Sequence, residues 1–359
     1  MNESTSLVNT DASFWTGELE YELPEGRIAQ VPTARREMSR LMVVDPRSAG
    51  GAGELSHGVF ADLPRFLPDG ALLVANDSKV VPARLRGRKE STGGAVELLI
   101  LAVQAGSIAP AMVRVAKPLH AGQALEFEGG VTARVLEPPV HGRGLFDFAP
   151  LDVGEVLRRC GQLPLPPYIE RGDGPTPADL ERYQTVYAAH PGSVAAPTAG
   201  LHFTPELLGE LETKGFEFTT ITLHVGPGTF TPVRGDVATH EMEEESYEVG
   251  EATAQRIANA KAEGRPVVAV GTTTVRALES AATGIGRVEP GWGSSRLFIR
   301  PGHRFSVVDA LITNFHLPGS TLLSLVTALA GRDCIGRAYG SAIAEGYRFY
   351  SYGDAMLIR

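Results

Sequence analysis

The chain has 359 residues, of which 43% are hydrophobic and 21% charged, and its formal net charge is −9. This length suits two or three domains of about 150 residues each, and the composition excludes disordered, collagen-like and coiled-coil proteins. Cys160 and Cys334 lie far apart, outside any Cys-x-x-Cys motif, which predicts neither a disulfide framework nor a thiolate zinc site. Because long apolar runs and a basic, apolar leader pattern are missing from the sequence, we expect a cytoplasmic protein without membrane contact.

Short apolar runs follow one another between residues 70 and 150, separated by clusters of Gly, Pro, Asn and Asp. The runs cover residues 72–75, 96–103, 111–115, 131–136 and 145–148. Short strands at this even spacing are typical of a small antiparallel barrel. We therefore predict an inserted β-barrel domain at 67–155.

Helix and strand patterns alternate toward the C-terminal end of the chain. Helices are predicted at 153–160, 251–263, 275–282, 321–330 and 334–345, and strands at 218–225 and 267–270. This alternation is the signature of an α/β fold. The predicted architecture is therefore a larger α/β catalytic domain, discontinuous over 1–66 and 156–359, interrupted by the small antiparallel β-barrel domain.

Two loops rich in small residues each carry a histidine beside a predicted element. Residues 193–203 end just before a helix that Thr204 can cap, which places His202 at the helix start. Residues 222–230 place His224 at the end of a strand, directly before a glycine-containing turn. Because ligands of open α/β sheets bind beyond the carboxyl ends of the strands, both loops are candidate substrate sites as well as ordinary structural turns.

A hydroxyl-rich helix start follows the predicted strand at 267–270. Gly271 precedes three threonines, and Arg276 lies one turn further on. Free backbone N–H groups and hydroxyls at a helix start suit a carboxylate or a phosphate. The order of residues is not that of a P-loop, and simple capping is the alternative interpretation.

Four of the histidines in the C-terminal half of the chain stand near the candidate loops, namely His202, His224, His240 and His316. No two of them stand at the short spacings of zinc motifs, so we expect no bound metal. Neutral imidazoles fit acid–base or substrate hydrogen-bonding roles better.

Charge is distributed unevenly along the chain. Residues 79–117 contain seven basic and two acidic residues, a local balance of +5. Residues 236–251 contain seven acidic residues and neither Lys nor Arg, a local balance of −7. The first segment is suited to phosphate contacts, or is a solvated barrel face, whereas the second repels phosphates.

Taken together, these segments resemble the S-adenosylmethionine:tRNA ribosyltransferase-isomerase family of queuosine biosynthesis, from about Tyr21 to Ile358. The matching stretches are residues 38–41, 76–85, 182–187, 196–203, 222–230, 271–279, 313–323 and 352–356. The resemblance implies transfer and isomerisation of the ribosyl part of S-adenosylmethionine onto 7-aminomethyl-7-deazaguanine in tRNA. Epoxyqueuosine-tRNA, adenine and methionine are the implied products, and S-adenosylmethionine is a consumed substrate, so no separate cofactor is expected.

The resemblance and the loops together predict the residues of the site. For catalysis they are His202, His224, His240, Glu243 and His316, one of which would form the ylide at C5′ of the sulfonium. For substrate binding they are Thr198, Gly200, Gly226, Gly228, Thr272, Thr273, Arg276 and Asn314, with Arg276 and the helix start holding the methionine carboxylate. For RNA binding they are Lys79, Arg84, Arg86, Lys89 and Lys117. The acidic segment at 236–251 would stabilise the sulfonium.

The sequence departs from the family pattern at two positions of interest. Glu243 stands where the family has a second histidine, and Gly319 where it has a lysine. Two other functions are therefore kept open: transfer of the same ribosyl group to an acceptor other than tRNA, and RNA binding without catalysis. The sequence leaves the oligomeric state open and slightly favours a monomer.

Overall fold

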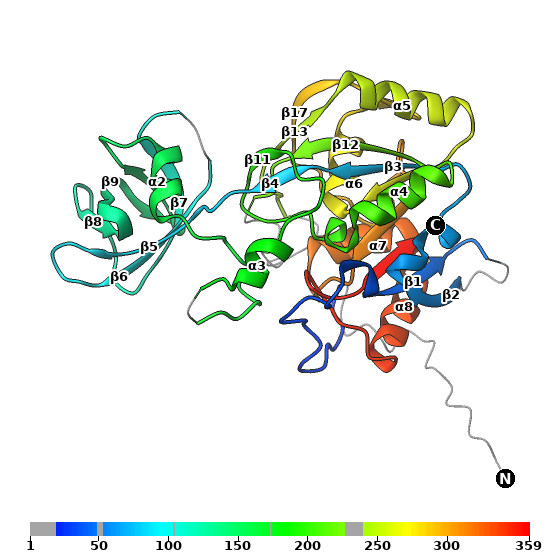
Figure 1. Ribbon diagram of the computed structural model, residues 1–359, viewed down its shortest axis with the longest axis horizontal. Helices are drawn as coiled ribbons and strands as arrows, with labels where there is room; N and C mark the ends of the chain where they lie inside the picture. Colours follow the sequence, from blue (N-terminus) through cyan, green and yellow to red (C-terminus); the bar gives the residue numbers. More distant parts are fainter. Residues whose placement is uncertain (1–18, 49–52, 103–104, 173, 227–239) are drawn as a thin grey trace, which may run out of the picture.

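The computed structural model describes residues 19–48, 53–102, 105–172, 174–226 and 240–359. Its elements form a large mixed sheet with helices on both faces and a separate closed barrel that projects beside β4 and β11 (Figure 1). The fold class predicted from the sequence, α/β with a small antiparallel barrel, is confirmed. Within the described ranges, no helix is long and apolar enough to cross a membrane.

The large sheet has nine strands in the order β17-β13-β12-β3-β14-β18-β19-β1-β2. Strands β12, β3, β14 and β18 run parallel to one another in its centre. The strand bounds are β1 Arg40–Asp45, β2 Glu54–Val59, β3 Leu72–Asn76, β12 Glu217–Leu223, β13 Glu245–Val249, β14 Val267–Val270, β17 Gly291–Ser295, β18 Ala310–Asn314 and β19 Ala355–Ile358. The carboxyl ends of the four central strands therefore meet at one edge of the sheet, where ligands of such sheets bind.

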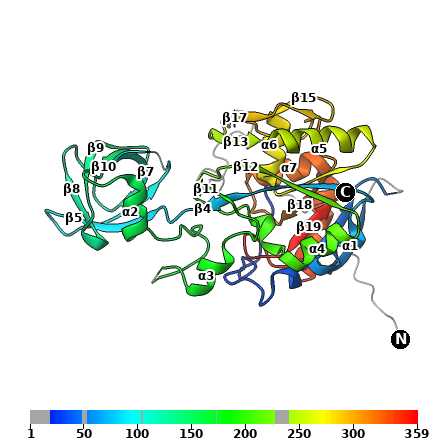
Figure 2. The same cartoon turned by 45° about the horizontal axis from the view of Figure 1, so that its top comes forward.

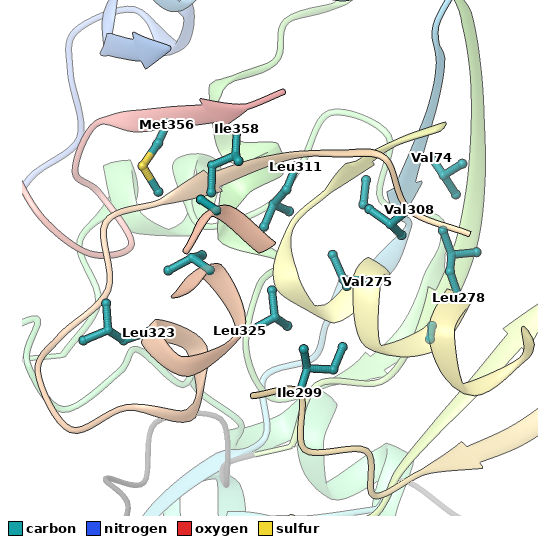
Figure 3. Packing of buried hydrophobic residues seen from close by; sticks show 14 of the residues in the cluster. Val74, Val275, Leu278, Ile299, Val308, Leu311, Leu323, Leu325, Met356 and Ile358 are labelled. Atoms are coloured by element: carbon teal, nitrogen blue, oxygen red, sulfur yellow. The ribbon is translucent and has the colours of Figure 1, made fainter. Parts of the chain in front are cut away.

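Helices cover both faces of this sheet because its central strands are apolar on both sides. Buried residues of α5, α6, α7 and α8 pack on one face, and Figure 3 shows Val275, Leu278 and Leu323 among the side chains of this cluster. Residues of α1 and α4 pack on the other face. The helix bounds are α1 Leu63–Phe66, α3 Pro177–Arg182, α4 Pro205–Thr213, α5 Glu251–Ala262, α6 Thr272–Ser280, α7 Thr321–Ala330 and α8 Arg332–Ala344.

The barrel is closed by six antiparallel strands in the order β10-β7-β6-β5-β8-β9, and Figure 2 looks into it. The strand bounds are β5 Arg84–Lys89, β6 Ala95–Ile100, β7 Ile108–Val115, β8 Ala124–Phe127, β9 Thr132–Val140 and β10 Arg143–Asp147. Helix α2, Val153–Cys160, packs its apolar side onto this barrel core. Two short parallel strands, β4 Ser78–Val80 and β11 His190–Ser193, stand between barrel and sheet. Two further short strands, β15 Ala282–Gly284 and β16 Arg287–Val288, form a hairpin.

The start of the predicted insertion at 67–155 is wrong. The first apolar run assigned to the barrel, residues 72–75, lies in strand β3, Leu72–Asn76, in the centre of the large sheet. All five of its residues are buried, which is the pattern of a strand covered on both faces and not of a barrel strand with one solvated face. The barrel strands themselves begin only at Arg84.

Most of the other predicted elements are found within a few residues of their expected bounds. Helix α6 is an exception, since it begins at Thr272 and not at residue 275. Thr274 lies inside the helix, and its hydroxyl donates to the carbonyl of Val270, one turn earlier. The aromatic run near the C-terminal end belongs to the core, with Tyr347 and Phe349 fully buried.

Candidate active site

A small cavity of about 40 Å³, partly open to solvent, lies where β14 and β18 end. Its lining contains five of the residues predicted from the sequence, brought together from three separate segments. They are Thr198, Thr272, Thr273, Asn314 and His316. Because the cavity lies at the carboxyl edge of the parallel strands, it has the position expected of a ligand site in this class of fold.

Asn314 ties the cavity to the buried His202 behind it. Its amide nitrogen lies 3.2 Å from Nε2 of His202 and donates over 3.1 Å to the carbonyl of Tyr350. A carbonyl oxygen can only accept, so the side-chain atom of Asn314 that faces Tyr350 and His202 is its NH₂ group. This NH₂ group also donates to His202, so Nε2 of His202 is an acceptor. The proton of His202 is therefore on Nδ1, which lies 2.7 Å from the hydroxyl oxygen of Ser39.

The other polar atom of the Asn314 side chain is a buried amide oxygen. This atom, Oδ1, accepts no hydrogen bond within the described part of the chain, and the hydroxyl of Thr273 is in the same situation. Both residues line the cavity. A buried polar atom without a hydrogen bond costs about 1–3 kcal/mol. A ligand that donates to Oδ1 and pairs with the Thr273 hydroxyl would remove this cost.

The start of helix α6 forms one wall of the cavity. Gly271 has φ +90°, a conformation that favours glycine, and it makes no side-chain cap to the helix. The first N–H groups of a helix lack acceptors within the helix. Thr272 and Thr273 therefore present both backbone N–H groups and hydroxyls to the cavity, which suits a carboxylate.

Both histidines at the cavity are held neutral. Burial lowers the pKa of His202 to about 3, helped by the positive charges of Arg348, Arg36 and Arg182. Burial also lowers the pKa of His316 to about 3. An imidazole with so low a pKa is a weak proton acceptor. The geometry therefore suits hydrogen-bonding roles for both, as with the hydroxyl of Thr313 at 2.9 Å from Nε2 of His316.

Two tyrosines of the cavity wall were missed as site residues by the sequence analysis. Tyr168 and Tyr350 both line the cavity, with their rings packed edge to face. Burial raises the pKa of both hydroxyls, so the rings are neutral and apolar. Tyr350 has φ +73°, which is strained for an aromatic residue and is found at functional sites. This dihedral angle has no signal in the sequence.

Arg276 lies outside the cavity lining and already has a carboxylate partner. It forms an ion pair with Glu245, and both side chains are 4% exposed. The other oxygen of Glu245 accepts from the backbone N–H of Gly226 at 3.1 Å. The predicted role of Arg276 toward the methionine carboxylate therefore has a structural competitor inside the chain.

The acidic segment pairs with arginines from other elements where the structure describes it. Glu243 contacts Arg143 of the barrel and is 43% exposed, while Glu244 pairs with Arg296. These carboxylates are therefore engaged by side chains of the opposite sign and do not line the cavity. His240 packs its ring against Phe298 and also lies outside the lining.

The glycines of the predicted site have different surroundings. A Cβ atom at Gly200 would lie 2.0 Å from the hydroxyl of Tyr187, so only glycine allows this close approach. Gly226 is held by Glu245, as above, and Gly228 lies outside the described residues. Gly319, at the position of the family's lysine, has φ +66° and tolerates a side chain poorly.

The residues predicted to bind RNA fall into two groups. Lys79 and Lys117 are exposed, and Arg84 and Arg86 line a groove between the barrel and the proline-rich residues 164–167, where both face Glu97. Lys89 is different, because it is 6% exposed and donates to backbone carbonyls of the barrel. A direct phosphate contact by Lys89 is therefore excluded, since its ammonium group is covered and already paired. Within the described ranges, no group of three or more His, Cys, Asp and Glu side chains is placed to hold a metal ion.

Comparison with known proteins places the chain in a family. The family model described as queuosine biosynthesis protein matches residues 16–358. The chain belongs to this family. It is 50% identical over 349 residues to the S-adenosylmethionine:tRNA ribosyltransferase-isomerase of Anaeromyxobacter dehalogenans, covering 95% of this chain and 98% of the relative. It is 49% identical to the enzyme of that name from Sorangium cellulosum, with 95% and 97% covered.

A solved structure supports the same assignment. The crystal structure of an S-adenosylmethionine tRNA ribosyltransferase from Thermotoga maritima matches with a TM-score of 0.53 and 34% identity, covering 96% of this chain and 100% of that chain. The family resemblance found in the sequence is thus confirmed.

Proposed function

We propose that this queuosine-family chain transfers the ribosyl moiety of S-adenosylmethionine to 7-aminomethyl-7-deazaguanine in tRNA and isomerises it to give epoxyqueuosine-tRNA, with release of adenine and methionine. The observation that carries the proposal is the cavity at the sheet edge, built from the small-residue loops, in a chain about half identical to relatives named for this activity. These relatives favour this function over a non-tRNA acceptor and over RNA binding without catalysis. S-adenosylmethionine is itself consumed, so the reaction needs no further cofactor.

The cavity lining carries polar and aromatic groups that match each part of S-adenosylmethionine. The uncapped start of α6, with Thr272 and Thr273, offers N–H groups and hydroxyls to the methionine carboxylate. The unpaired Oδ1 of Asn314 accepts a hydrogen bond from a ribose hydroxyl or the adenine amino group. The aromatic rings of Tyr168 and Tyr350 line the cavity and would attract the cationic sulfonium by cation–π interaction, although neither ring carries a charge.

The pKa values of the histidines decide which of them can act as the base. The sulfonium acidifies the adjacent C5′ protons, and a base that removes one of them starts the chemistry. Since the pKa values of His202 and His316 are near 3, these two residues position substrate and Asn314 and do not serve as that base. His240, which lies outside the cavity lining, and His224, whose pKa burial also lowers, are the remaining predicted imidazoles for this step.

The tRNA would approach across the junction of barrel and sheet. Lys79 stands on β4 in this junction, and Arg84 and Arg86 line the adjoining groove. Guanidinium groups suit phosphate oxygens; both arginines face Glu97 at 3.6–3.7 Å, and Arg84 also donates to the carbonyl of Leu165. A cytoplasmic location follows from the tRNA substrate.

The decisive assay for this function is product release. Purified protein is incubated with S-adenosylmethionine and tRNA carrying the modified base, and adenine and methionine are measured. Release of adenine and methionine in equal amounts, and only when this tRNA is present, supports the proposal. Release only with a small-molecule acceptor, or tRNA binding without release, contradicts it.

A matched pair of variants tests whether this cavity binds S-adenosylmethionine. Thr273→Val removes one unpaired hydroxyl and is expected to raise the KM for S-adenosylmethionine about fivefold, as for the loss of one hydrogen bond of about 1 kcal/mol. Thr213→Val, on the exposed side of α4, should leave KM unchanged.

A further inference from the structure

A second polar cluster lies beside the cavity, at the ends of β3 and β12. The hydroxyl of Thr222 donates to Oδ1 of Asp77 at 2.7 Å, and Nδ1 of His190 lies 3.1 Å from the same oxygen. Asp77 is buried, whereas the side chain of His190 is 58% exposed. None of these three residues lines the cavity assigned to S-adenosylmethionine.

The hydrogen bonds fix the orientation of His190. A carboxylate can only accept, so Nδ1 of His190 carries the proton that faces Asp77, and Nε2 is left as a lone pair on the solvent side. A histidine oriented by a buried carboxylate is the arrangement that serves as a general base in hydrolytic triads, because the carboxylate stabilises the imidazolium that forms. The titratable groups facing His190 are Asp77, from the connection between β3 and β4, and His224, from the end of β12.

An aromatic surface adjoins this pair. The His224 ring is held between the backbone of Gly192 and the indole of Trp292, whose ring centre is 6.5 Å away at an angle of 29°. A Cβ atom at Gly192 would come within 2.6 Å of the His224 ring, so this contact requires glycine. Trp292 is 67% exposed, and Nδ1 of His224 is buried without a partner in the described part of the chain. An exposed indole of this kind stacks on unpaired bases.

The cluster also borders the basic surface. Strand β11 pairs with β4 so that His190 lies opposite Ser78, and Pro191 opposite the exposed Lys79. A base carried by a large, negatively charged nucleic acid can therefore reach His190 from solvent while a phosphate contacts Lys79. A small substrate enclosed in the cavity has no need of so exposed a base.

We propose that this cluster is the subsite for the acceptor base, in which Trp292 and His224 receive the planar ring and His190 is the proton acceptor for its aminomethyl group. The proposal rests on the proposed function. An alkylamine is an ammonium ion at neutral pH, with a pKa like that of lysine, and its nitrogen has no lone pair for bond formation. One N–H bond breaks, its electron pair stays on the amine nitrogen, and the proton forms a bond to Nε2 of His190, beside the carboxylate of Asp77.

The test uses single-turnover modification of tRNA at saturating S-adenosylmethionine, over a range of pH. His190→Asn keeps an N–H donor for Asp77 and removes the outer nitrogen, and His190→Gln is assayed in parallel in case one variant folds poorly. Both are expected to lower the rate constant at least 100-fold, in the range of general base catalysis, with an unchanged Kd for S-adenosylmethionine. Both should also lose the fall in rate at acid pH that protonation of an imidazole causes in the unmodified protein, and should regain rate at alkaline pH.

Two further variants complete the test. Trp292→Ala should raise the KM for tRNA, and Trp292→Phe should restore it, because phenylalanine still stacks. His141→Asn is the matched control: this exposed histidine in the barrel has φ +51°, which asparagine tolerates, and the rate should not change.

The outcomes separate this proposal from the proposed function. A rate within threefold of the unmodified protein in both His190 variants overturns the subsite, and so does a slowed variant that keeps the original pH profile, since that result marks a merely structural role. If the unmodified protein releases no adenine with modified tRNA, the proposed function itself fails.

Discussion

We expect Lys→Met substitutions at Lys89 and Lys79 to have opposite effects on barrel stability and tRNA binding, although both residues belong to the basic segment. Lys89 is 6% exposed, and its ammonium group donates to the carbonyls of Lys117 at 2.8 Å and Pro118 at 3.0 Å. Lys89→Met keeps the aliphatic stem and leaves both carbonyls without their donor. Hydrogen bonds to a charged group contribute about 1.5–3 kcal/mol each, and the desolvation of the ammonium group offsets part of this. We expect the barrel to lose roughly 2–4 kcal/mol of stability.

The exposed Lys79 is the matched control, with the same substitution. Lys79→Met should change stability by less than about 0.5 kcal/mol, as is usual for a surface position. It should lower the slope of log Kobs for tRNA against log salt by roughly one, the loss of one phosphate contact. Lys89→Met should leave this slope unchanged.

Hydrogen exchange and salt titration together decide this prediction. Exchange of amides in β5 and β8 reports the local stability of the barrel, and filter binding of tRNA at several salt concentrations gives the slope. An unchanged barrel stability with a reduced slope in Lys89→Met would refute the burial of this lysine and restore it as a phosphate contact.

Three other predictions follow from buried or paired charges. Glu245→Gln leaves Arg276 buried without its carboxylate and should lower the free energy of unfolding in urea by about 3–5 kcal/mol. The double variant Glu245→Leu, Arg276→Met should recover most of this stability, and additive losses would contradict the pairing. Since the pKa values of His202 and His316 are lowered to about 3, the unfolded chain binds more protons below pH 6.5, and stability should fall by roughly 1.4 kcal/mol per pH unit for each histidine as the pH drops from 6.5 toward 3; a flat unfolding midpoint over pH 6 to 4 would argue against their burial. Glu243→Ala should leave the calorimetric Kd of S-adenosylmethionine within error, because Glu243 is paired at the surface; a tenfold weaker Kd would place it in the site.

The sequence predicts well those features that depend on local pattern. The barrel and most helices follow from the spacing of apolar runs and from caps such as Thr204, which accepts a hydrogen bond from the backbone N–H of Leu207 as expected. The five predicted residues that share the cavity could be found because each follows a strand end or opens a helix. Strand β3 was misassigned because a short apolar run does not reveal whether one face or both are covered.

Features that depend on contacts between distant segments could not be predicted in this way. Lys89 looks like any other surface lysine until the fold places the carbonyls of residues 117 and 118 around its ammonium group. His190 and Asp77 are 113 positions apart, and neither has a local signal for pairing. Tyr350 is revealed by its positive φ, a property of the folded backbone. Tertiary structure alone decides which titratable groups meet.

The central claim, ribosyl transfer from S-adenosylmethionine to tRNA, is tested most directly by following the carbon atoms. The protein is given tRNA bearing the 7-aminomethyl base and S-adenosylmethionine labelled with ¹³C either in the ribose or in the methyl group, and the tRNA is digested to nucleosides for mass spectrometry. We predict that the ribose label, and none of the methyl label, appears in the modified nucleoside, in step with released adenine. Transfer of the methyl label, or a nucleoside without label, would contradict the account.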